Sequence, residues 1–254
     1  MEALRLAAGH LVRSRRTVAL TGAGVSTESG LPDFRSDSGL WVGVDPLEVA
    51  SLSAFRRRPE VFYHFYRTRL AQLGGARPNA AHHALVALEA HGLAAVITQN
   101  VDGLHQAAGS QRVIELHGNL REAACSACGW RGPIAVIRDA LDRNELPSCP
   151  VCGSRPKPNV VLFEEVLPPA AYDAAEREVR SADLLLVVGS SLHVTPAAWL
   201  PEVARTHGAA LIIANDEPTG MDSLADVILR GRAATVLPAL AAAVAAGRER
   251  EHSS

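Results

Sequence analysis

Four cysteines offer the most specific chemistry in the sequence. They form two Cys-x-x-Cys pairs separated by twenty residues, Cys125 with Cys128 and Cys149 with Cys152. Four thiolates at this spacing suit a tetrahedral zinc ion, and a site closed by four sulfur ligands leaves no position for water or substrate. We therefore predict a structural zinc site. A redox-active pair is the alternative, but it leaves the second Cys-x-x-Cys without a role.

A glycine-containing loop follows the first predicted strand. The apolar residues 17–20 lead into Gly22 and Gly24. Such a loop lets backbone N–H groups approach a phosphate, and a helix that follows it can present its N-terminal end to the same anion. Thr27 stands where the third glycine of G-x-G-x-x-G would fall, so this motif alone leaves a plain structural turn as an equal alternative.

Four later strands are each expected to end in residues able to contact a nucleotide or move a proton. These residues are Gln99, Asn100 and Asp102 after strand 94–98, His117 after strand 113–116, Gly189, Ser190 and Ser191 after strand 184–188, and Asn215 after strand 210–214. Ligands of open parallel sheets bind beyond the carboxyl ends of the strands. The alternatives are a helix N-cap for the amide and carboxylate residues and an ordinary hydrogen-bonded role for the histidine.

Strands and helices alternate along the chain, which predicts an α/β fold with a Rossmann-like, doubly wound parallel sheet. Helices are expected at 2–13, at 45–72 in two segments of which the second begins at Pro59, and at 78–92, 169–180, 195–207 and 233–246. Further strands are expected at 159–163 and 227–229. We predict an NAD-binding domain at 1–119 and 159–247, with a helical and flap insert at about 36–78. A small zinc-binding domain at 120–158 and a disordered tail at 248–254 complete the division.

Composition narrows the class of protein. The chain has 254 residues and a formal net charge of −2, so we expect no direct binding to nucleic acid. It has no apolar run of membrane-spanning length and no secretory signal pattern, so we expect no membrane association and a cytoplasmic location. Clustered cysteines fit that compartment. The oligomeric state is not determined by these features, and we favour a monomer.

Taken together, these motifs resemble those of the sirtuins, which are NAD-dependent protein lysine deacylases. The matching segments are GAGVSTESGLPDFR, TQNVDGLH, the ELHG that contains His117, both cysteine pairs, PNVVLF, GSSLHVTP and the strand end at Asn215. They occur in the family's order over nearly the whole chain. The resemblance is to bacterial-type members, and it implies NAD as a consumed co-substrate, one structural zinc ion and an acylated lysine protein or peptide as substrate.

The resemblance also implies roles for individual residues. His117 matches the general base, and Asn100 and Asp102 belong to the catalytic set. Val160 and Phe163 match the edge of the channel for the acyl-lysine, whose peptide is held as an added strand. The residues that match NAD contacts are Gly22, Ala23, Gly24, Asp33, Phe34, Arg35, Gln99, Asn100, Asp102, Gly189, Ser190, Ser191 and Asn215.

The implied reaction is an acyl transfer to ADP-ribose. Nicotinamide leaves, the acyl oxygen attacks the ribose carbon, and His117 takes a proton from the ribose hydroxyls. The products are nicotinamide, free lysine and O-acetyl-ADP-ribose.

Two departures from the family pattern bear on the substrate. Glu164 stands where family members commonly have glycine, and we expect this extra carboxylate to favour basic peptides. Members that prefer succinyl or malonyl groups carry Tyr-x-x-Arg, whereas Tyr63 here has Tyr66 at that spacing and Arg67 one position late. A Tyr66-x-x-Arg69 lies nearly a turn further on. We therefore predict acetyl or another uncharged acyl group.

Three alternatives share parts of this pattern. A protein mono-ADP-ribosyltransferase would use the same NAD site. A zinc-ribbon module could bind nucleotide without turnover. A hydride-transferring dehydrogenase is the weakest alternative, because the glycine pattern is incomplete.

Overall fold

Six parallel strands form the large sheet, in the order β3-β2-β1-β7-β8-β9. They are β1 (Thr17–Thr21), β2 (Leu93–Thr98), β3 (Val113–Glu115), β7 (Leu184–Val188), β8 (Ala210–Asn215) and β9 (Val227–Arg230). The computed structural model describes residues 1–34 and 39–252, the last two as backbone only. Every residue of β1 and β7 is buried, as expected for strands covered on both faces. The predicted doubly wound α/β fold is confirmed.

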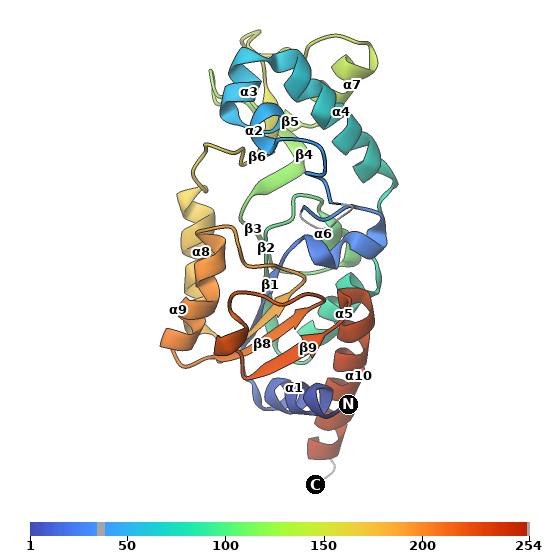
Figure 1. Cartoon of the computed structure of the whole chain (residues 1–254), viewed down its shortest axis with the longest axis vertical. Helices are drawn as coiled ribbons and strands as arrows, with labels where there is room; N and C mark the ends of the chain where they lie inside the picture. The colour runs from blue at the N-terminus through green and yellow to red at the C-terminus, as the bar shows by residue number, and fades with distance from the viewer. Residues whose placement is uncertain (35–38, 253–254) are drawn as a thin grey trace.

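Helices cover both faces of this sheet (Figure 1). One face packs against α1 (Glu2–Arg13), α5 (Ala80–Glu89) and α10 (Ala233–His252), and the other against α8 (Pro169–Ser181) and α9 (Leu200–Thr206). Leu11, Leu85 and Leu240 belong to the first of these apolar cores, and Val179 and Leu200 to the second. Because helices close both faces, the edge formed by the strand ends is where a ligand can reach the sheet.

The chain changes direction between β1 and β7. Strands β2 and β3 lie to one side of β1, and β8 and β9 lie to the other side of β7. Loops that leave neighbouring strands in opposite directions open a crevice at the carboxyl end of the sheet. The loop after β1 and the loop after β7 therefore meet at the position where this fold binds its ligand.

A smaller antiparallel sheet, in the order β5-β4-β6, lies at the opposite end of the molecule from the chain termini (Figure 1). Its strands are β4 (Gly118–Ala124), β5 (Arg131–Pro133) and β6 (Lys157–Val160), and α7 (Ala135–Asp142) accompanies them. The helices α2 (Pro46–Val49), α3 (Leu52–Arg57) and α4 (Pro59–Gly75) precede it in the chain. Phe62 and Tyr63 of α4 share one apolar core with Ile137 and Leu120. We call this assembly of α2, α3, α4, α7 and the small sheet the upper module.

Several predicted elements differ from the structure. The expected helix after the glycine loop is replaced by two single 3₁₀ turns, η1 (Ala23–Val25) and η2 (Thr27–Ser29). The expected strand 159–163 is β6, which begins at Lys157 and pairs with β4 rather than joining the large sheet. A short α6 (Leu104–Ala108) follows β2. The segment 45–72, predicted as two helical segments, contains three helices, and the last begins at Pro59 as predicted.

The C-terminal helix is longer than predicted. It continues past Ala246 to His252, so the predicted disordered tail is wrong for residues 248–252. The side chain of Arg248 anchors this end, because its guanidinium donates to the carbonyl oxygen of Ser14 at 3.0 Å. None of the helices described here combines the length and the apolar character needed to span a bilayer.

Candidate active site

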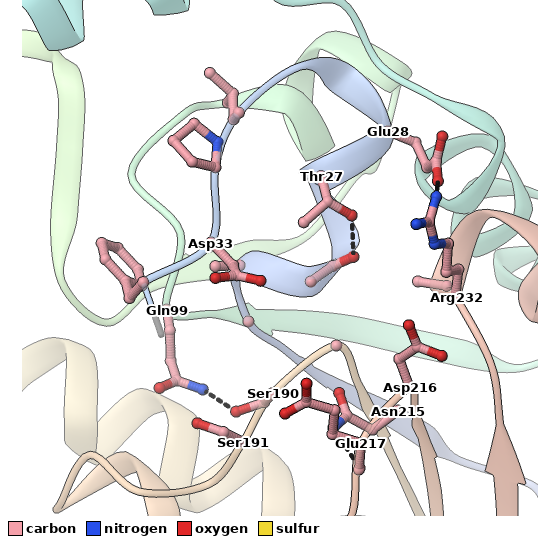
Figure 2. A pocket seen from close by; sticks show the side chains of 18 of the residues that line it. Thr27, Glu28, Asp33, Gln99, Ser190, Ser191, Asn215, Asp216, Glu217 and Arg232 are labelled. Carbon is pink, nitrogen blue, oxygen red and sulfur yellow. Dashed lines mark hydrogen bonds and ion pairs between the residues drawn. The ribbon is translucent and has the colours of Figure 1, made fainter. Parts of the chain in front are cut away.

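A cavity of about 650 Å³ lies between the loops that follow β1, β2, β7 and β8 (Figure 2). This volume falls in the range of nucleotide and cofactor sites. Eleven residues predicted from the sequence line it, namely Gly22, Ala23, Gly24, Asp33, Phe34, Gln99, His117, Gly189, Ser190, Ser191 and Asn215. Arg35, which was also predicted, lies outside the described residues. The strand ends that were identified one by one thus converge on a single cavity.

Part of the cavity wall was not assigned a role from the sequence. Thr27 and Glu28 of η2 line it, as does Arg232 before α10. Glu217 also lines the cavity, and it belongs to the strand end 215–217 that was expected to recognise ribose or adenine. Glu28 and Arg232 form an ion pair of 2.9 Å (Figure 2), although they are 204 positions apart in the chain. Glu217 follows the predicted Asn215 by two residues, and Glu28 lies inside the glycine-loop motif. Only Arg232 comes from a segment that carries no motif.

The glycines of the two central loops allow direct contact between loop backbones. A Cβ on Gly22 would lie 2.7 Å from the carbonyl oxygen of Gly189, and a Cβ on Gly189 would lie 2.5 Å from the nitrogen of Val25. The N–H groups of Gly22 and Gly24 donate to the carbonyls of Val188 and Gly189 at 3.0 and 2.9 Å. Both N–H groups therefore have partners within the protein, and contact of this loop with a phosphate stays a prediction.

His117 is half-buried at the edge of the cavity, between β3 and β4. Its Nδ1 lies 2.9 Å from the carbonyl oxygen of Gln99. A carbonyl accepts and cannot donate, so Nδ1 carries the hydrogen and Nε2 of the neutral ring has the free lone pair. Burial lowers the pKa of this histidine below its ordinary value, and the hydrogen bond to Gln99 opposes that effect. At neutral pH the ring can therefore accept a proton.

Gln99 and Ser190 connect the two halves of the cavity floor. The amide nitrogen of Gln99 donates to the hydroxyl of Ser190 at 2.8 Å, which joins the end of β2 to the end of β7 (Figure 2). The same Gln99 holds His117 through its backbone carbonyl. One residue thus positions both the imidazole ring and the serine of the neighbouring loop.

Asn100 and Asp102 lie behind the cavity wall rather than in it. The amide nitrogen of Asn100 donates to the carbonyl of Gly22 and to the hydroxyl of Ser26, both at 3.1 Å. Ser26 in turn donates to Asp102 Oδ2 at 2.7 Å. Ser26 is 2 % exposed and was not singled out in the sequence, because a serine in a glycine loop carries no distinctive signal. These three side chains tie the loop after β2 to the loop after β1.

Aromatic side chains border the path between the cavity and the upper module. The ring of Trp41 stacks on Phe34 at 5.7 Å and on Phe65 at 5.8 Å, and meets the edge of Phe163 at 5.9 Å. Phe163 is 43 % exposed, whereas Val160 is 6 % exposed and packs in the core of the upper module. The structure thus brings Phe163 to this surface but not the side chain of Val160.

The residues at and near the Tyr-x-x-Arg positions have other partners. Tyr63 is buried and its hydroxyl donates to the carbonyl of Pro156 at 2.6 Å. Tyr66 is also buried, and burial raises the pKa of both phenols. Arg67 donates to Asn144 near the end of α7, and Arg69 donates to Gln72 on its own helix. Tyr63 and Arg67 therefore do not form a pair for a carboxylated acyl group, whereas the charge of Arg69 lies near the phenol of Tyr66.

The backbone at Glu164 has a conformation that favours glycine. Its φ is +73°, a left-handed conformation that favours glycine. Its carboxylate accepts from the backbone nitrogen of Ser53 at 2.8 Å, in the first turn of α3. The next carboxylate, that of Glu165, accepts from Leu162 and pairs with Lys157. Both acidic groups therefore have partners within the protein, which offsets part of the charge that Glu164 presents to a peptide.

The four cysteines form one cluster, and their arrangement fits zinc. All four sulfurs lie within 4.8 Å of one another, with 3.6 Å between Cys125 and Cys152 and 3.7 Å between Cys128 and Cys149. A tetrahedron of thiolates about 2.3 Å from a zinc ion has edges of about 3.8 Å. The two turns are equivalent, since Gly129 donates to the carbonyl of Cys125 and Gly153 to that of Cys149.

Comparison with known proteins identifies relatives over nearly the whole chain. Residues 22–196 match the family model described as "Sir2 family". The chain is 46 % identical over 237 residues to NAD-dependent protein deacylase 2 of Archaeoglobus fulgidus, covering 92 % of this chain and 93 % of the relative. It is also 46 % identical over 235 residues to an NAD-dependent protein deacylase of Thermus thermophilus, covering 91 % of each.

Solved structures agree with these matches. A Sir2 enzyme structure has a TM-score of 0.91 at 44 % identity, covering 97 % of this chain and 99 % of that one. A Sir2 homologue in complex with NAD has a TM-score of 0.89 at 42 % identity, covering 95 % and 93 %. A Sir2 variant with deacetylated p53 peptide and 3′-O-acetyl-ADP-ribose has a TM-score of 0.87 at 38 % identity, covering 96 % and 98 %.

Proposed function

Because this chain belongs to the Sir2 family and is an NAD-dependent protein deacylase, we propose that it transfers acetyl or other uncharged acyl groups from lysine to ADP-ribose. Nicotinamide and free lysine are the other products, and one water molecule is consumed because the amide C–N bond is broken as the ester forms. The observation that carries the proposal is the position of His117, whose unprotonated Nε2 stands at the edge of the cavity while Nδ1 is held by Gln99.

In this proposal NAD occupies the cavity in a fixed direction. Asn215 and Glu217 contact the adenosine, and Phe34 and Gln99 lie at the nicotinamide ribose. NAD supplies the glycosidic bond that breaks. Nε2 of His117 removes a proton from a ribose hydroxyl, and the carbonyl of Gln99 stabilises the resulting imidazolium through the Nδ1–H hydrogen bond. Asn100 and Asp102 act through Ser26, which keeps the loop after β1 in register with the loop after β2.

We place the acyl-lysine between the large sheet and the upper module. Val161 donates its N–H to the carbonyl of His117 at 2.9 Å, so the segment before Phe163 is fixed beside the proposed base. The exposed ring of Phe163 then forms one wall of the lysine channel. The peptide would add as a strand along this segment.

The preference for uncharged acyl groups rests on the contacts of Tyr63 and Tyr66. Both phenols are buried, and the hydroxyl of Tyr63 already has a partner. The nearest cation to Tyr66 is Arg69, which donates to Gln72 on its own helix. If Arg69 keeps that partner, a succinyl or malonyl carboxylate enters the channel unpaired, and an unpaired buried charge is costly. Acetyl and short alkyl chains avoid that cost.

The domain boundaries, the role of the metal, the location and the oligomeric state are also proposals. We assign residues 1–119 and 159–247 to the NAD-binding domain and 120–158 to a zinc-binding domain in which the metal is structural. A cytoplasmic location and a monomeric state also stay predictions.

A panel of lysine peptides with one sequence and different acyl groups tests the function. With acetyl, butyryl and succinyl peptides, we expect NAD-dependent nicotinamide release for the first two to exceed that for succinyl by about tenfold or more. Mass spectrometry should find the acyl group on ADP-ribose. We expect His117→Ala to lower product formation by about a hundredfold or more, and His64→Ala, at an exposed position of α4, serves as the matched control.

Two results would contradict the proposal. Hydrolysis of succinyl peptide as fast as acetyl peptide would overturn the acyl class. Label from the adenylate of NAD that ended on protein instead of a small acyl product would favour the mono-ADP-ribosyltransferase.

A further inference from the structure

Glu115 ends β3 two positions before His117, and its carboxylate is the centre of a hydrogen-bond network. Oε1 accepts from Gln106 at 2.9 Å and from Nη1 of Arg121 at 2.8 Å. Oε2 accepts from Nη2 of Arg121 at 2.9 Å and from Asn119 at 3.2 Å. The side chain of Glu115 is 15 % exposed. A carboxylate with four donors, two of them from one guanidinium, is held in a single orientation.

The partners of Glu115 come from separate elements. Asn119 and Arg121 belong to β4, and Gln106 belongs to α6. The network therefore connects β3 and β4, which flank His117, to the helix that follows the Asn100–Asp102 loop. The hydrogen bond with Glu115 is the main reason why the pKa of Arg121 is raised.

The guanidinium of Arg121 also lies directly against the backbone of Gly103. A Cβ on Gly103 would approach Nη1 of Arg121 to 2.5 Å. Gly103 has a φ of +74° and is the N-cap of α6, immediately after Asp102. The backbone N–H of Leu120 donates to the carbonyl of Val101 at 2.9 Å. Arg121 and Leu120 thus hold β4 against the loop at Gly103 and Val101, on either side of Asp102.

The same loop is held on its other side by Ser26. Ser26 donates to Oδ2 of Asp102, and the backbone N–H of Leu104 donates to Oδ1 at 2.9 Å. Asp102 is therefore fixed between the loop after β1 and the start of α6. A displacement of α6 would move Asp102 relative to His117. The Glu115–Arg121 network resists that displacement from the side of the histidine, together with the backbone contacts of Gln99 and Val101.

We propose that Glu115 and Arg121 are positioning residues that set the distance between His117 and the Asn100–Asp102 loop. This proposal rests on the proposed function, in which His117 acts on NAD and the Asn100–Asp102 loop, through Ser26, positions the loop after β1. Neither residue contacts the cavity. Their effect would be on the rate of the chemical step, because small displacements of reacting groups change that rate more than they change binding.

A second buried carboxylate in the chain provides a matched control. Glu178 of α8 has a side chain that is 7 % exposed and pairs with both Arg16 and Arg112. It lies on the face of the sheet covered by α8, and it does not line the cavity. Glu115→Gln and Glu178→Gln remove the same charge from comparable ion-pair networks. A purely structural role predicts the same consequences for both.

The experiment measures kcat and KM for deacetylation together with Tm, at a temperature well below the Tm of every variant. We expect Glu115→Gln to lower kcat by about tenfold to a hundredfold with little change in peptide KM. Arg121→Met should behave similarly, and Arg121→Lys should recover part of the loss because it restores one charged donor to Glu115. Glu178→Gln should lower Tm and leave kcat within about twofold of wild type.

Different results would contradict the positioning role and the proposed function. If Glu115→Gln and Arg121→Met keep kcat within about twofold of wild type, or if kcat falls equally in Glu178→Gln, the positioning role is wrong. Failure of the proposed function would be seen instead in the wild-type protein, as the absence of O-acetyl-ADP-ribose among its products.

Discussion

The protonation state of His117 follows from one contact. The carbonyl of Gln99 requires a hydrogen on Nδ1, and partial burial keeps the ring neutral to lower pH than usual. A neutral imidazole with its lone pair at Nε2 is the form that a general base needs. The backbone carbonyl of Gln99 thus sets the tautomer that the proposed base needs.

This arrangement predicts the acid limb of the pH profile. Because the pKa of His117 is lowered, the active neutral form persists as the pH falls through 6.5, the ordinary histidine pKa. We expect kcat/KM for NAD, which reports the ionisations of the free enzyme, to decline only below that pH. His117→Gln should remove the limb along with most of the activity. A limb centred at or above about pH 7 would contradict the assignment.

Residue types at strand ends were predictable from the sequence, but some of their roles were not. The ends of β2, β7 and β8 supply Gln99, Ser190 and Asn215 to one cavity, as their positions predicted. The role of Gly22 was not predictable, because it depends on Gly189, which approaches it from a strand far along the chain. A contact between two backbones leaves no side-chain pattern.

Among the secondary-structure elements, α5 and α6 share a buried histidine pair. The rings of His82 and His105 are 4.9 Å apart. Burial lowers the pKa of His82 to about 4, with Asp102 opposing and His83 reinforcing the effect. Burial and then His82 lower the pKa of His105 to about 3. Within the described part of the chain, His82 Nε2 and His105 Nδ1 have no hydrogen-bond partner, which is consistent with neutral rings.

This pair predicts acid sensitivity of the folded state. The unfolded histidines take up protons near pH 6.5, whereas the folded ones stay neutral until about pH 4 and about pH 3. Their contribution to stability is therefore complete above pH 6.5 and lost as the pH falls below it. At about pH 5.5, each should lower the free energy of unfolding by about 1 kcal/mol relative to neutral pH.

Urea unfolding at about pH 7.5 and about pH 5.5 measures this difference. His105→Gln should reduce the loss between the two pH values by about 1 kcal/mol. His64→Gln, at an exposed position of α4, is the control. Zinc loss at low pH would affect both variants alike. An unchanged loss in His105→Gln would rule out the pair as its source.

The large sheet was easier to predict than the upper module. Strands β1, β7 and β8 are apolar runs buried in a parallel sheet, and such runs are visible in a sequence. The strands β4 and β5 have mixed, polar sequences, so no apolar run marks them. The upper module is stabilised instead by the cysteine cluster and by the aromatic residues of α4. Those contacts are made by residues distant in sequence and leave no periodic pattern.

For the molecule as a whole, the cysteine cluster and the cavity are connected through a single strand. β4 begins at Gly118, directly after His117, and ends at Ala124, directly before Cys125. A loss of structure at the cysteines can therefore displace β4 and, with it, the proposed base His117. The zinc site would be structural in its chemistry yet required for activity.

Removal of the metal tests this connection. We expect a chelator, or Cys152→Ser, to abolish hydrogen-exchange protection in residues 118–160 and to lower kcat by about tenfold or more, while the strands of the large sheet remain protected. Ser126→Ala, at an exposed position of the other cysteine turn, should retain both metal and activity. Metal-free protein with full activity would show that β4 holds His117 without help from the cysteines.

The contact between the two glycine loops also limits how this protein can diversify. Gly22, Gly24 and Gly189 touch one another through their backbones, so a larger residue at one of them cannot be accommodated by a change at another, since none can become smaller. A substitution at one of the three positions therefore cannot be compensated by a substitution at another. A laboratory search for altered dinucleotide selectivity should therefore leave them fixed and vary the rim, where Glu28 and Arg232 meet through side chains alone.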